Sequence, residues 1–311
     1  MYRDHKILVA IPAFRAEATI AGVIAGLPAF VDFIVVVDDA SPDATSAAVG
    51  KIADARLHLV RHEKNRGVGG AMTTAFRKAI ELGSDVVVKI DSDGQMDPAQ
   101  MPRLLDAIVE RGFDYAKGNR FLHSEALGNM PTHRLVGSLA LTFMTKLASG
   151  YWNIFDPQNG YIAARTDVLA RLDLDQISTG YFFENDMLIH LNIIERRVTD
   201  IPMPARYGDE RSSMSVARVL LSFPPRLFLR FWKRIWQRYV LRDFSPVAVF
   251  LMLGLPMLLW GVGFGARAWY QSATSGVVTT TGTVMISVLP LILGFELVLQ
   301  AIILDIQSTP K

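Results

Sequence analysis

The sequence of 311 residues contains no cysteine. Disulfide bonds, thiolate nucleophiles and thiolate zinc sites are therefore excluded, and the composition is compatible with a reducing compartment. An excess of charge is also missing, since 32 basic and 30 acidic residues give a formal net charge of +2. Nucleic-acid binding usually needs a basic field, so we expect no nucleic-acid partner. The apolar run at residues 6–12 is too short for a signal peptide and is interpreted as a first strand.

The glycine-rich segment at residues 65–71 does not complete a known nucleotide-binding motif. Gly67, Gly69 and Gly70 suggest a dinucleotide fingerprint, but Met72 stands where the third glycine is needed. The segment also follows the third predicted strand and not the first. A Gly-Lys pair followed by Ser or Thr is absent, which excludes a Walker-type phosphate loop. A tight turn and close helix packing account for these glycines.

The first two thirds of the chain has the pattern of an α/β domain. Apolar runs rich in β-branched residues predict strands, and longer stretches with helical periodicity lie between them. Such alternation predicts crossover units and a mostly parallel sheet, in which ligands bind at the carboxyl ends of the strands. The predicted strands are residues 7–11, 33–37, 57–60 and 86–90, and the predicted helices include residues 72–82 and 101–109.

The last third of the chain has the composition of a membrane anchor. Residues 244–266 carry no charge and can cross a bilayer core of about 30 Å. Residues 283–304 are a second candidate span, interrupted only by Glu296 and Gln300. A buried core helix is the alternative for either run. The small residues Gly261 and Gly265 would permit close helix contact and hint at a homo-oligomer.

A helix with aromatic and basic side chains is predicted directly before the first span. Its composition favours a helix that lies on anionic lipid, and the alternative is a helix packed on the preceding domain. The apolar members are Phe228, Phe231, Trp232, Ile235, Trp236 and Tyr239, and the basic members, expected on the other side, are Arg226, Arg230, Lys233, Arg234 and Arg238.

The expected organisation is thus a catalytic domain at residues 1–213, juxtamembrane helices at 214–243 and two transmembrane helices at 244–306. The loop between the spans is expected to carry one charge, Arg267. The positive-inside rule then places the main domain of an integral membrane protein in the cytoplasm.

The segment at residues 90–95 holds two carboxylates, Asp91 and Asp93, directly after a predicted strand. Carboxylates separated by one residue can share a hard cation that keeps open positions for substrate phosphates. The alternative is a turn in which they cap the helix that starts near Pro98. Polar or glycine-rich segments also follow the first, second and third strands.

The order and spacing of these segments resemble family 2 glycosyltransferases of the GT-A fold. Within that family they are most like polyprenyl-phosphate glycosyltransferases of the dolichol-phosphate mannose synthase type. The segments that carry the resemblance are residues 11–14, 37–45, 65–71, 90–95, 118–121 and 156–161, together with the two C-terminal spans. The resemblance implies a Rossmann-like catalytic domain and an inverting, metal-dependent transfer from a UDP- or GDP-linked sugar to an undecaprenyl- or dolichyl-type phosphate. The product would be a lipid-phosphate-linked monosaccharide.

The resemblance assigns roles by position. It implies that the nucleoside is held by Pro12, Phe14, Glu17 and Asp39, and that Mg²⁺ or Mn²⁺ is held by Asp91, Asp93 and Gln95. It assigns the acceptor phosphate to Arg120, Arg134 and Ser138. The sequence departs from the family's Tyr-Asn-Glu after the proline, because Phe14, Arg15 and Ala16 precede Glu17.

Two further segments are candidates for substrate contacts. Arg206 and Arg211 lie in a stretch with glycine and serines that could close over the diphosphate, and the alternative is an ordinary linker. Glu184 and Asp186 begin a helical stretch and are expected to orient the sugar or the acceptor, although acidic residues also suit a helix N-terminus by themselves. A lipid phosphate is already anionic and needs cations more than a general base.

Two other functions remain open from the sequence. The first is a family 2 transferase that acts on a glycan or lipid-saccharide hydroxyl and depends on Asp186 as a base. The second is a non-catalytic membrane scaffold that binds nucleotide-sugars. A processive synthase is disfavoured because a Gln-x-x-Arg-Trp motif and additional spans are absent.

Overall fold

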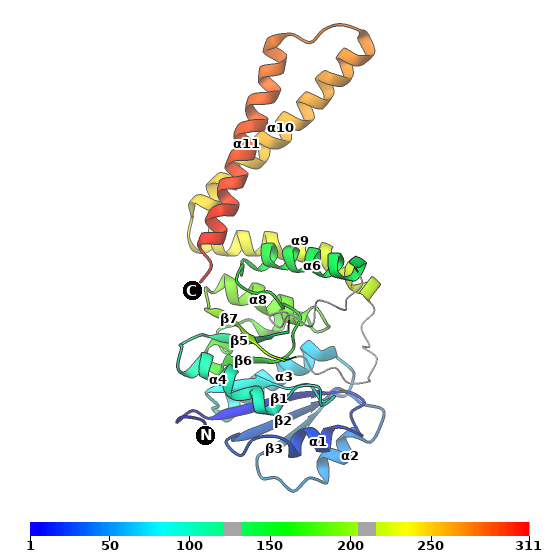
Figure 1. Cartoon of the computed structure of the whole chain (residues 1–311), viewed down its shortest axis with the longest axis vertical. Coiled ribbons are helices and arrows are strands. Elements are labelled where there is room, and N and C mark those ends of the chain that lie inside the picture. Colours follow the sequence, from blue (N-terminus) through cyan, green and yellow to red (C-terminus); the bar gives the residue numbers. More distant parts are fainter. Residues whose placement is uncertain (121–131, 205–215, 311) are drawn as a thin grey trace. The chain divides into compact units, whose positions relative to one another are not determined.

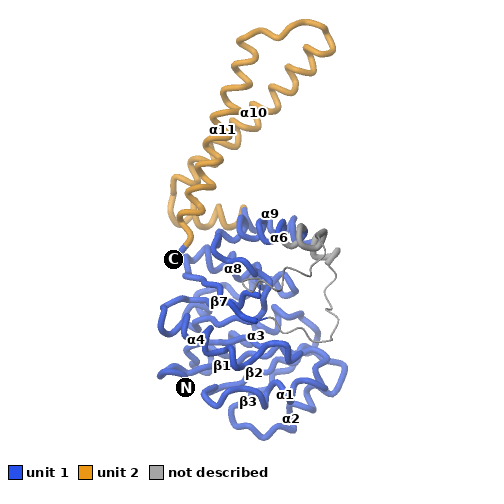
Figure 2. The backbone as a smooth tube through the Cα atoms, viewed as in Figure 1, with its two compact units in different colours: residues 1–231, 310–311 blue, residues 232–309 orange. Residues whose placement is uncertain are grey.

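A computed structural model of the chain describes residues 1–120, 132–204 and 216–310. The chain forms two compact units, Met1–Phe231 and Trp232–Thr309 (Figure 2). The boundary between the units falls inside the segment predicted as juxtamembrane helices. The predicted division into a catalytic domain, juxtamembrane helices and two transmembrane helices therefore differs from the division into two compact units. It stays a prediction of which residues contact a membrane.

The first unit is built on a seven-stranded sheet with the order β3-β2-β1-β4-β6-β5-β7 (Figure 1). Neighbouring strands run parallel except β6, which is antiparallel to β4 and β5. The strands are β1 Ile7–Ala13, β2 Phe33–Asp38, β3 Leu57–Arg61, β4 Val86–Lys89, β5 Tyr115–Asn119, β6 Ile162–Arg165 and β7 Val198–Pro202. The prediction of a mostly parallel α/β sheet is confirmed.

Helices cover both faces of this sheet because alternate strand residues point to opposite sides. Ile7, Val9 and Ile11 face one core, which is shared with α1, α2 and α4, whereas Leu8 and Ala10 face a second core shared with α3, α7 and α8. The helices are α1 Ile20–Ala25, α2 Thr45–Gly50, α3 Gly67–Leu82, α4 Met101–Val109, α6 Thr132–Ser149, α7 Thr166–Leu169, α8 Phe183–Ile193 and α9 Val216–Arg234, with short 3-10 turns η1 Pro98–Gln100 and η2 Leu174–Gln176.

Helix α3 begins five residues earlier than the periodicity predicted. The stretch at 65–71 was expected to be a loop, but Gly67 is already helical. The reason is a long-range cap, because the Asp39 carboxylate accepts hydrogen bonds from the backbone N–H groups of Arg66 and Gly67, at 2.8 and 2.7 Å. The glycines serve packing as predicted, since a Cβ on Gly69 would lie 2.1 Å from the carbonyl oxygen of Ser178.

A third apolar cluster joins α6, α8 and α9 in the first unit. Leu141 and Ala148 of α6, and Phe223 and Leu227 of α9, are buried together with Ile189 of α8. Helices α6 and α9 are drawn side by side in Figure 1, which agrees with this cluster. Because α8 also packs on the sheet, its two faces bury apolar side chains in different cores.

The second unit is a helical hairpin. It contains the end of α9, a π-helical segment η3 Ile235–Arg242, and the long helices α10 Pro246–Ser275 and α11 Thr281–Gln307. Glycines let the two helices approach closely, since a Cβ on Gly294 would lie 2.5 Å from the backbone nitrogen of Leu258. Gly261 likewise faces Leu291 of α11, so it serves contact within the chain and gives no support to the hint of an oligomer.

Both long helices could cross a membrane by length and composition. Only 28% and 17% of their most apolar windows are buried, which argues against the alternative of a core helix. Exposed Trp236 lies in η3, the segment before α10, and exposed Trp269 and Tyr270 lie near the far end of α10, as in the aromatic belts of membrane spans. The position expected for Arg267 was wrong, because it lies inside α10 and not in the connecting loop.

The basic residues of the predicted juxtamembrane helix do not all lie on an exposed side opposite the apolar ones. Arg234 is fully buried and forms an ion pair with Asp305, with its Nη1 2.6 Å from Oδ1. Arg238 is buried as well and donates to the carbonyl oxygen of Ser308 at 2.7 Å. Tyr239 completes the cluster, because its hydroxyl donates to Asp305 at 2.6 Å.

Candidate functional site

The candidate site lies at one edge of the sheet of the first unit. Strands β1, β2, β4 and β5 share a direction, so their carboxyl ends meet at this edge. The residues that follow these ends are Phe14, Asp39, Asp91 and Arg120. The structure thus brings together four segments that are far apart in the sequence, which is the arrangement of ligand sites in such sheets.

The first and second loops at this edge are tied to each other. The Ser41 hydroxyl accepts from the backbone N–H of Arg15 at 3.1 Å, and the Thr45 hydroxyl accepts from that of Ala16 at 2.9 Å. Arg15 and Ala40 both have positive φ angles, 56° and 57°. A non-glycine residue in this region is strained, and such strain is concentrated at ligand sites. The two loops therefore form one rigid wall of the edge.

Two predicted donor residues stand on this wall. Phe14 is 45% exposed, and the Arg15 guanidinium lies 5.3 Å from the centre of its ring. An exposed aromatic ring beside a cation is suited to stack on a nucleobase. Pro12 is half-buried in β1, one residue from the strand end, and supports the loop from below.

Glu17 binds the second loop. Its carboxylate accepts from the backbone N–H of Ala44 at 3.2 Å, and its own backbone N–H donates to Asp43 at 3.3 Å. Both contacts lie at the start of α2. Glu17 therefore stabilises the wall, and its place one residue later than in the family pattern agrees with this role.

Asp39 is buried below the wall and is already engaged in several contacts. Besides capping α3, its Oδ1 lies 2.7 Å from Nδ1 of His62, whose Nε2 lies 2.9 Å from the Thr74 hydroxyl. A carboxylate can accept about four hydrogen bonds, and Asp39 accepts those of Arg66, Gly67 and His62. By this count Asp39 can accept about one further hydrogen bond.

Asp91 lies at the centre of the edge, next to a buried lysine. The Nζ atom of Lys89 is 2.7 Å from Oδ1 of Asp91 and 3.5 Å from Oε1 of Glu184. It also donates to the carbonyl oxygen of Gly160 at 3.2 Å. Burial by itself would lower the pKa of Lys89, but the carboxylates of Asp91 and Glu184 outweigh it and raise that pKa. The site therefore contains an ammonium between two acidic residues.

The residues predicted to bind metal provide only part of a coordination sphere. Asp91 has a side chain that is 33% exposed, Asp93 is exposed, and Gln95 is half-buried with its backbone N–H 3.0 Å from Oδ1 of Asp93. Within residues 1–120, 132–204 and 216–310, no group of three or more acidic or histidine side chains could hold a metal ion. Oxygen donors that leave positions open suit Mg²⁺ or Mn²⁺, which take further oxygens from phosphates and water.

A second buried lysine stands beside the first on the same face of the sheet. Lys89 and Lys117 are both in register with Ile162 of β6, which runs between them. Lys117 is fully buried and donates to the carbonyl oxygen of Asn159. Burial lowers its pKa to about 8, although Glu184, Asp156 and Asp200 act in the opposite direction. The two lysines therefore hold adjacent carbonyls of the segment at 159–160.

Arg120 is held by a buried carboxylate. Asp156 accepts from Nε of Arg120 at 2.8 Å, from its Nη2 at 3.1 Å and from its backbone N–H at 3.2 Å. Asp156 is 2% exposed, whereas the Arg120 side chain is 41% exposed. A two-point contact to a planar guanidinium fixes its orientation as well as its position. The Arg120 guanidinium is thus held in one orientation at the substrate edge of the sheet.

Asp200, in the middle of β7, supports the segment that carries Asp156. Its carboxylate accepts from the side chain of Asn119 and from the backbone N–H of Phe155, both at 2.7 Å. Burial raises the pKa of Asp200 to about 6, although these hydrogen bonds and Lys117 act to lower it. Asp200 links the middle of β7 to the end of β5 and to the loop before β6.

Glu184 and Asp186, predicted together as orienting residues, point to different places. Glu184 faces Lys89 at the edge. Asp186 is fully buried and accepts from the backbone and hydroxyl of Ser178, both at 2.8 Å, and from Arg230 of α9 at 2.7 Å. The geometry does not bring Asp186 to the substrate edge, because its contacts hold α9 against α8.

Four predicted residues have side chains outside the described part of the chain. Arg134 and Ser138 lie on α6, four residues apart, and only their backbone is described. Arg206 and Arg211 lie outside the described residues altogether. Their roles stay predictions.

Sequence reasoning missed Lys89 and Lys117, and gave no individual role to Asp156 or Gly160. A signal for Lys89 was available, because a single lysine in the apolar run at 86–90 must be paired if that strand is central. The partner could not be read from the sequence, since Glu184 lies 95 residues further on.

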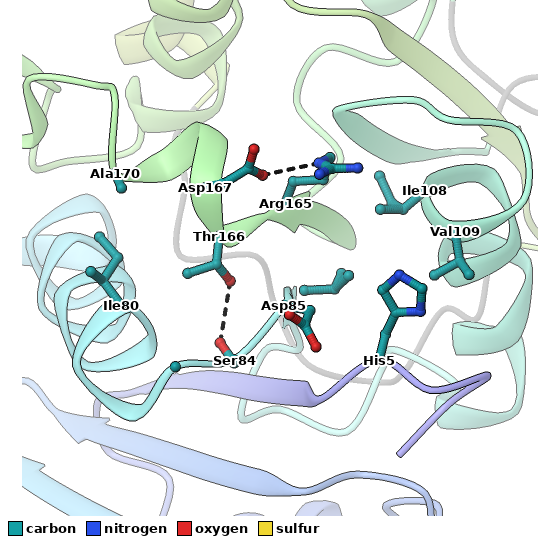
Figure 3. A pocket seen from close by; sticks show the side chains of 12 residues that line it. His5, Ile80, Ser84, Asp85, Ile108, Val109, Arg165, Thr166, Asp167 and Ala170 are labelled. Carbon is teal, nitrogen blue, oxygen red and sulfur yellow. Dashed lines mark hydrogen bonds and ion pairs between the residues drawn. The ribbon is translucent and has the colours of Figure 1, made fainter.

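A cavity of about 380 Å³ opens at the opposite edge of the sheet (Figure 3). The polar groups around it bind each other or nearby backbone. Arg165 donates to Asp167 at 2.9 Å, the Ser84 and Thr166 hydroxyls lie 3.2 Å apart, and Asp85 accepts from the backbone of Lys6 at 2.7 Å. The cavity lies near the amino ends of β1 and β4 and shares no residue with the candidate site.

The chain is similar in sequence to a family of known proteins. The model of the family "Glycosyl transferase family 2" matches residues 8–173. Undecaprenyl-phosphate mannosyltransferase of Micrococcus luteus is 37% identical over 173 residues, which cover 55% of this chain and 70% of that protein. UDP-N-acetylglucosamine–dolichyl-phosphate N-acetylglucosaminyltransferase of Methanococcus voltae is 29% identical over 242 residues, which cover 73% of this chain and 95% of that protein.

A solved structure supports the same fold. Glucosyl-3-phosphoglycerate synthase from Mycobacterium tuberculosis, in complex with Mn²⁺ and UDP-glucose, superposes with a TM-score of 0.57. The identity is 22%, and the match covers 74% of this chain and 80% of the other. At this identity the comparison identifies the fold.

Proposed function

The chain belongs to glycosyl transferase family 2 and is a glycosyltransferase with the GT-A fold, and from this premise we propose that it transfers a sugar from a nucleotide-sugar to a polyprenyl phosphate. The reaction is inverting and depends on a divalent metal. The product is a monosaccharide linked to the lipid through one phosphate.

One observation carries the choice of acceptor. The two relatives described above differ in the sugar named, mannose in one and N-acetylglucosamine in the other, but both names contain a polyprenyl or dolichyl phosphate. The matches cover most of each relative. An arginine held in one orientation at the substrate edge, Arg120, agrees with an anionic acceptor.

The reaction itself needs orientation more than proton transfer. An oxygen of the lipid phosphate attacks the anomeric carbon of the sugar, and the bond from that carbon to the nucleoside diphosphate breaks. The electron pair leaves with the diphosphate. Arg120, with Arg134 and Ser138 of α6, would hold the attacking phosphate, and Phe14, Pro12, Glu17 and Asp39 would form the nucleoside wall. Arg206 and Arg211 would close over the diphosphate.

Asp91, Asp93 and Gln95 would hold Mg²⁺ or Mn²⁺, which supplies charge compensation for the departing diphosphate as a Lewis acid. Glu184 lies within reach of the same ammonium as Asp91, so it is the better candidate of the two acidic residues of α8 to orient the sugar.

A hydroxyl acceptor is less well supported. A neutral hydroxyl needs a base, and the candidate base was Asp186. That carboxylate is fully buried and accepts hydrogen bonds from Ser178 and Arg230, so it would first have to lose these contacts. We do not retain the non-catalytic scaffold, because the chain is a member of a transferase family with its acidic motif in place.

The hairpin of the second unit would anchor the enzyme in a membrane with the catalytic unit in the cytoplasm. Helix α10 has 30 residues and α11 has 27, enough to cross a core of about 30 Å. The link at residues 276–280 carries no charge, whereas α9 and η3 are rich in arginine and lysine. This asymmetry supports the cytoplasmic placement by the positive-inside rule.

The test is a panel of UDP- and GDP-linked sugars incubated with the purified protein, Mg²⁺ or Mn²⁺, and undecaprenyl phosphate. Mass spectrometry should find a lipid whose mass has increased by one sugar residue. A parallel reaction with undecaprenol, which lacks the phosphate, provides the matched control. Transfer to the alcohol, or to a glycan hydroxyl, with none to the phosphate would refute the proposal.

A further inference from the structure

We propose that Lys89 is a positioning residue for the reaction, and that its ammonium fixes where Asp91 and Glu184 stand relative to each other and to the segment at 159–160. This inference rests on the proposed function, because it concerns the site of that reaction. Lys89 is not a catalytic residue in this scheme, since it acts through the two carboxylates and touches no substrate.

The first support is the position of Lys89 in the sheet. It is the last residue of β4, and its side chain lies on the face that is covered by α3 and α8, because its neighbours Val88 and Ile90 face the other core. It is 1% exposed. An ammonium at such a site is stable only when it is paired and hydrogen-bonded.

The second support is that three separate elements converge on this ammonium. Asp91 comes from the end of β4, Glu184 from the start of α8, and the Gly160 carbonyl from the loop before β6, at 2.7, 3.5 and 3.2 Å. A lysine has three N–H donors, so one residue can bind all three. Removing it would leave two carboxylates near each other without the charge that compensates them.

The third support is the glycine at position 160. A Cβ there would lie 2.4 Å from the Lys89 ammonium and 3.0 Å from Oδ2 of Asp91. The first distance is shorter than real Cβ atoms show and the second is tighter than most of their contacts, so a side chain at 160 would push the ammonium or the carboxylate aside. Gly160 does not have a positive φ angle, so the close approach, and not the backbone conformation, favours glycine here. The absence of a side chain at Gly160 leaves space for the Lys89 ammonium beside Asp91.

This arrangement restricts how Asp91 can act. Its Oδ1 is engaged by Lys89, so a divalent cation would be met mainly by Oδ2. The ammonium therefore selects one oxygen and holds it at one place on the edge. The same Nζ atom of Lys89 also contacts Glu184. Lys89 therefore connects Asp91, which is proposed to bind the metal, with Glu184, which is proposed to orient the sugar.

The test compares Lys89→Met, which keeps the length of the side chain and removes the charge, with wild type. We expect kcat to fall by about a hundredfold, the loss typical of a displacement of about 1 Å at a reacting centre. The KM for the nucleotide-sugar should change less than kcat. Gly160→Ala should cause a similar loss in kcat, although the lysine is retained.

Lys117→Met is the matched control, because it neutralises a lysine that is equally buried, in register with the same residue of β6 and bonded to the neighbouring carbonyl. We expect a similar decrease in the thermal unfolding midpoint and a loss in kcat at least about ten times smaller. Equal losses of kcat in both variants would mean that each lysine only stabilises the fold, and the inference would be overturned.

A second measurement does not depend on turnover. Binding of Mn²⁺ in the presence of UDP, and separately GDP, is followed by the electron paramagnetic resonance signal of free Mn²⁺. Positioning predicts about tenfold weaker binding in Lys89→Met. Tighter binding would show that the ammonium only repels the cation, which would refute the inference. If the wild-type protein transferred no sugar, the proposed function would fail, and the role of Lys89 would be decided by this titration.

Chemical rescue separates charge from packing. Lys89→Ala removes a propylamine fragment, and Asp91 is partly exposed, so a small amine can reach the space from the substrate edge. Added propylammonium should restore part of kcat, whereas 1-propanol at the same concentration should not. Equal rescue by the alcohol would show that only volume is required, and the positioning role would be rejected.

Discussion

The ion pair between Arg120 and Asp156 gives the sharpest test of the acceptor site. Asp156→Asn keeps the volume of the side chain but removes its charge and one of the acceptors that orient the guanidinium. Hydrogen bonds to charged groups are worth roughly 1.5–3 kcal/mol. Arg120 is 41% exposed, so water replaces part of this contact and the low end applies. We therefore expect a rise of about tenfold in the KM for polyprenyl phosphate.

The assay measures initial rates at saturating nucleotide-sugar while undecaprenyl phosphate is varied. Asp54→Asn is the control, because Asp54 binds Arg56 through the same two-point geometry, at 3.0 and 2.7 Å, near the amino end of β3. It should leave the acceptor KM unchanged. If only the net charge of the site mattered, the acceptor KM of Asp156→Asn would fall, because loss of a carboxylate would strengthen the attraction of the site for phosphate. A lower acceptor KM in Asp156→Asn would therefore refute the view that orientation of Arg120 matters more than net charge.

Four further outcomes are expected. Asp93→Asn should depress turnover by orders of magnitude, and a chelator should silence wild type until Mg²⁺ or Mn²⁺ is restored; full activity in chelator would contradict the metal assignment. Arg134→Ala should lower acceptor affinity by about ten- to a hundredfold with little change in calorimetric donor binding, and Arg134→Lys should recover only part. Deletion of everything after Arg242 should leave a folded domain by circular dichroism that loses more activity on long-chain lipid phosphate than on a short soluble analogue. Asp200 has a pKa raised by burial from 3.8 to about 6, so its contribution to stability is present at low pH and is lost as the pH rises through about 6; Asp200→Asn should flatten this part of the curve of unfolding midpoint against pH.

The strands and the two spans could be predicted because their signals are local. A buried parallel strand needs a run of apolar, β-branched residues, and a span needs about 20 apolar residues, so both patterns can be read from neighbours in the sequence. The start of α3 could not be predicted in this way. Its cap, Asp39, is 28 residues away from Gly67, and the pairing of β2 with β3 brings the two residues together.

The same distinction separates the parts of the site. The aspartates at 91 and 93 could be predicted as a site because their spacing and the strand before them are local features. Lys89 and Asp156 depend on partners from other elements, so their roles required the fold. For Asp186, a local pattern led to a wrong pairing of roles with Glu184. Positions i and i+2 of a helix point about 200° apart. Glu184 therefore faces the substrate edge, whereas Asp186 faces α9.

The cluster at the base of the hairpin illustrates why composition alone misplaces charged residues. The basic and aromatic pattern of residues 226–239 is typical of a helix lying on lipid, and exposed Trp236 agrees with that interpretation. Arg234 nevertheless lies fully buried, because Asp305 comes back beside it at the end of α11. Two charges that are 71 residues apart can be buried together only if the hairpin closes in one register, since an unpaired charge at this depth would be strongly destabilising. The ion pair therefore favours one pairing of the two long helices, in addition to the close contacts at Gly261 and Gly294.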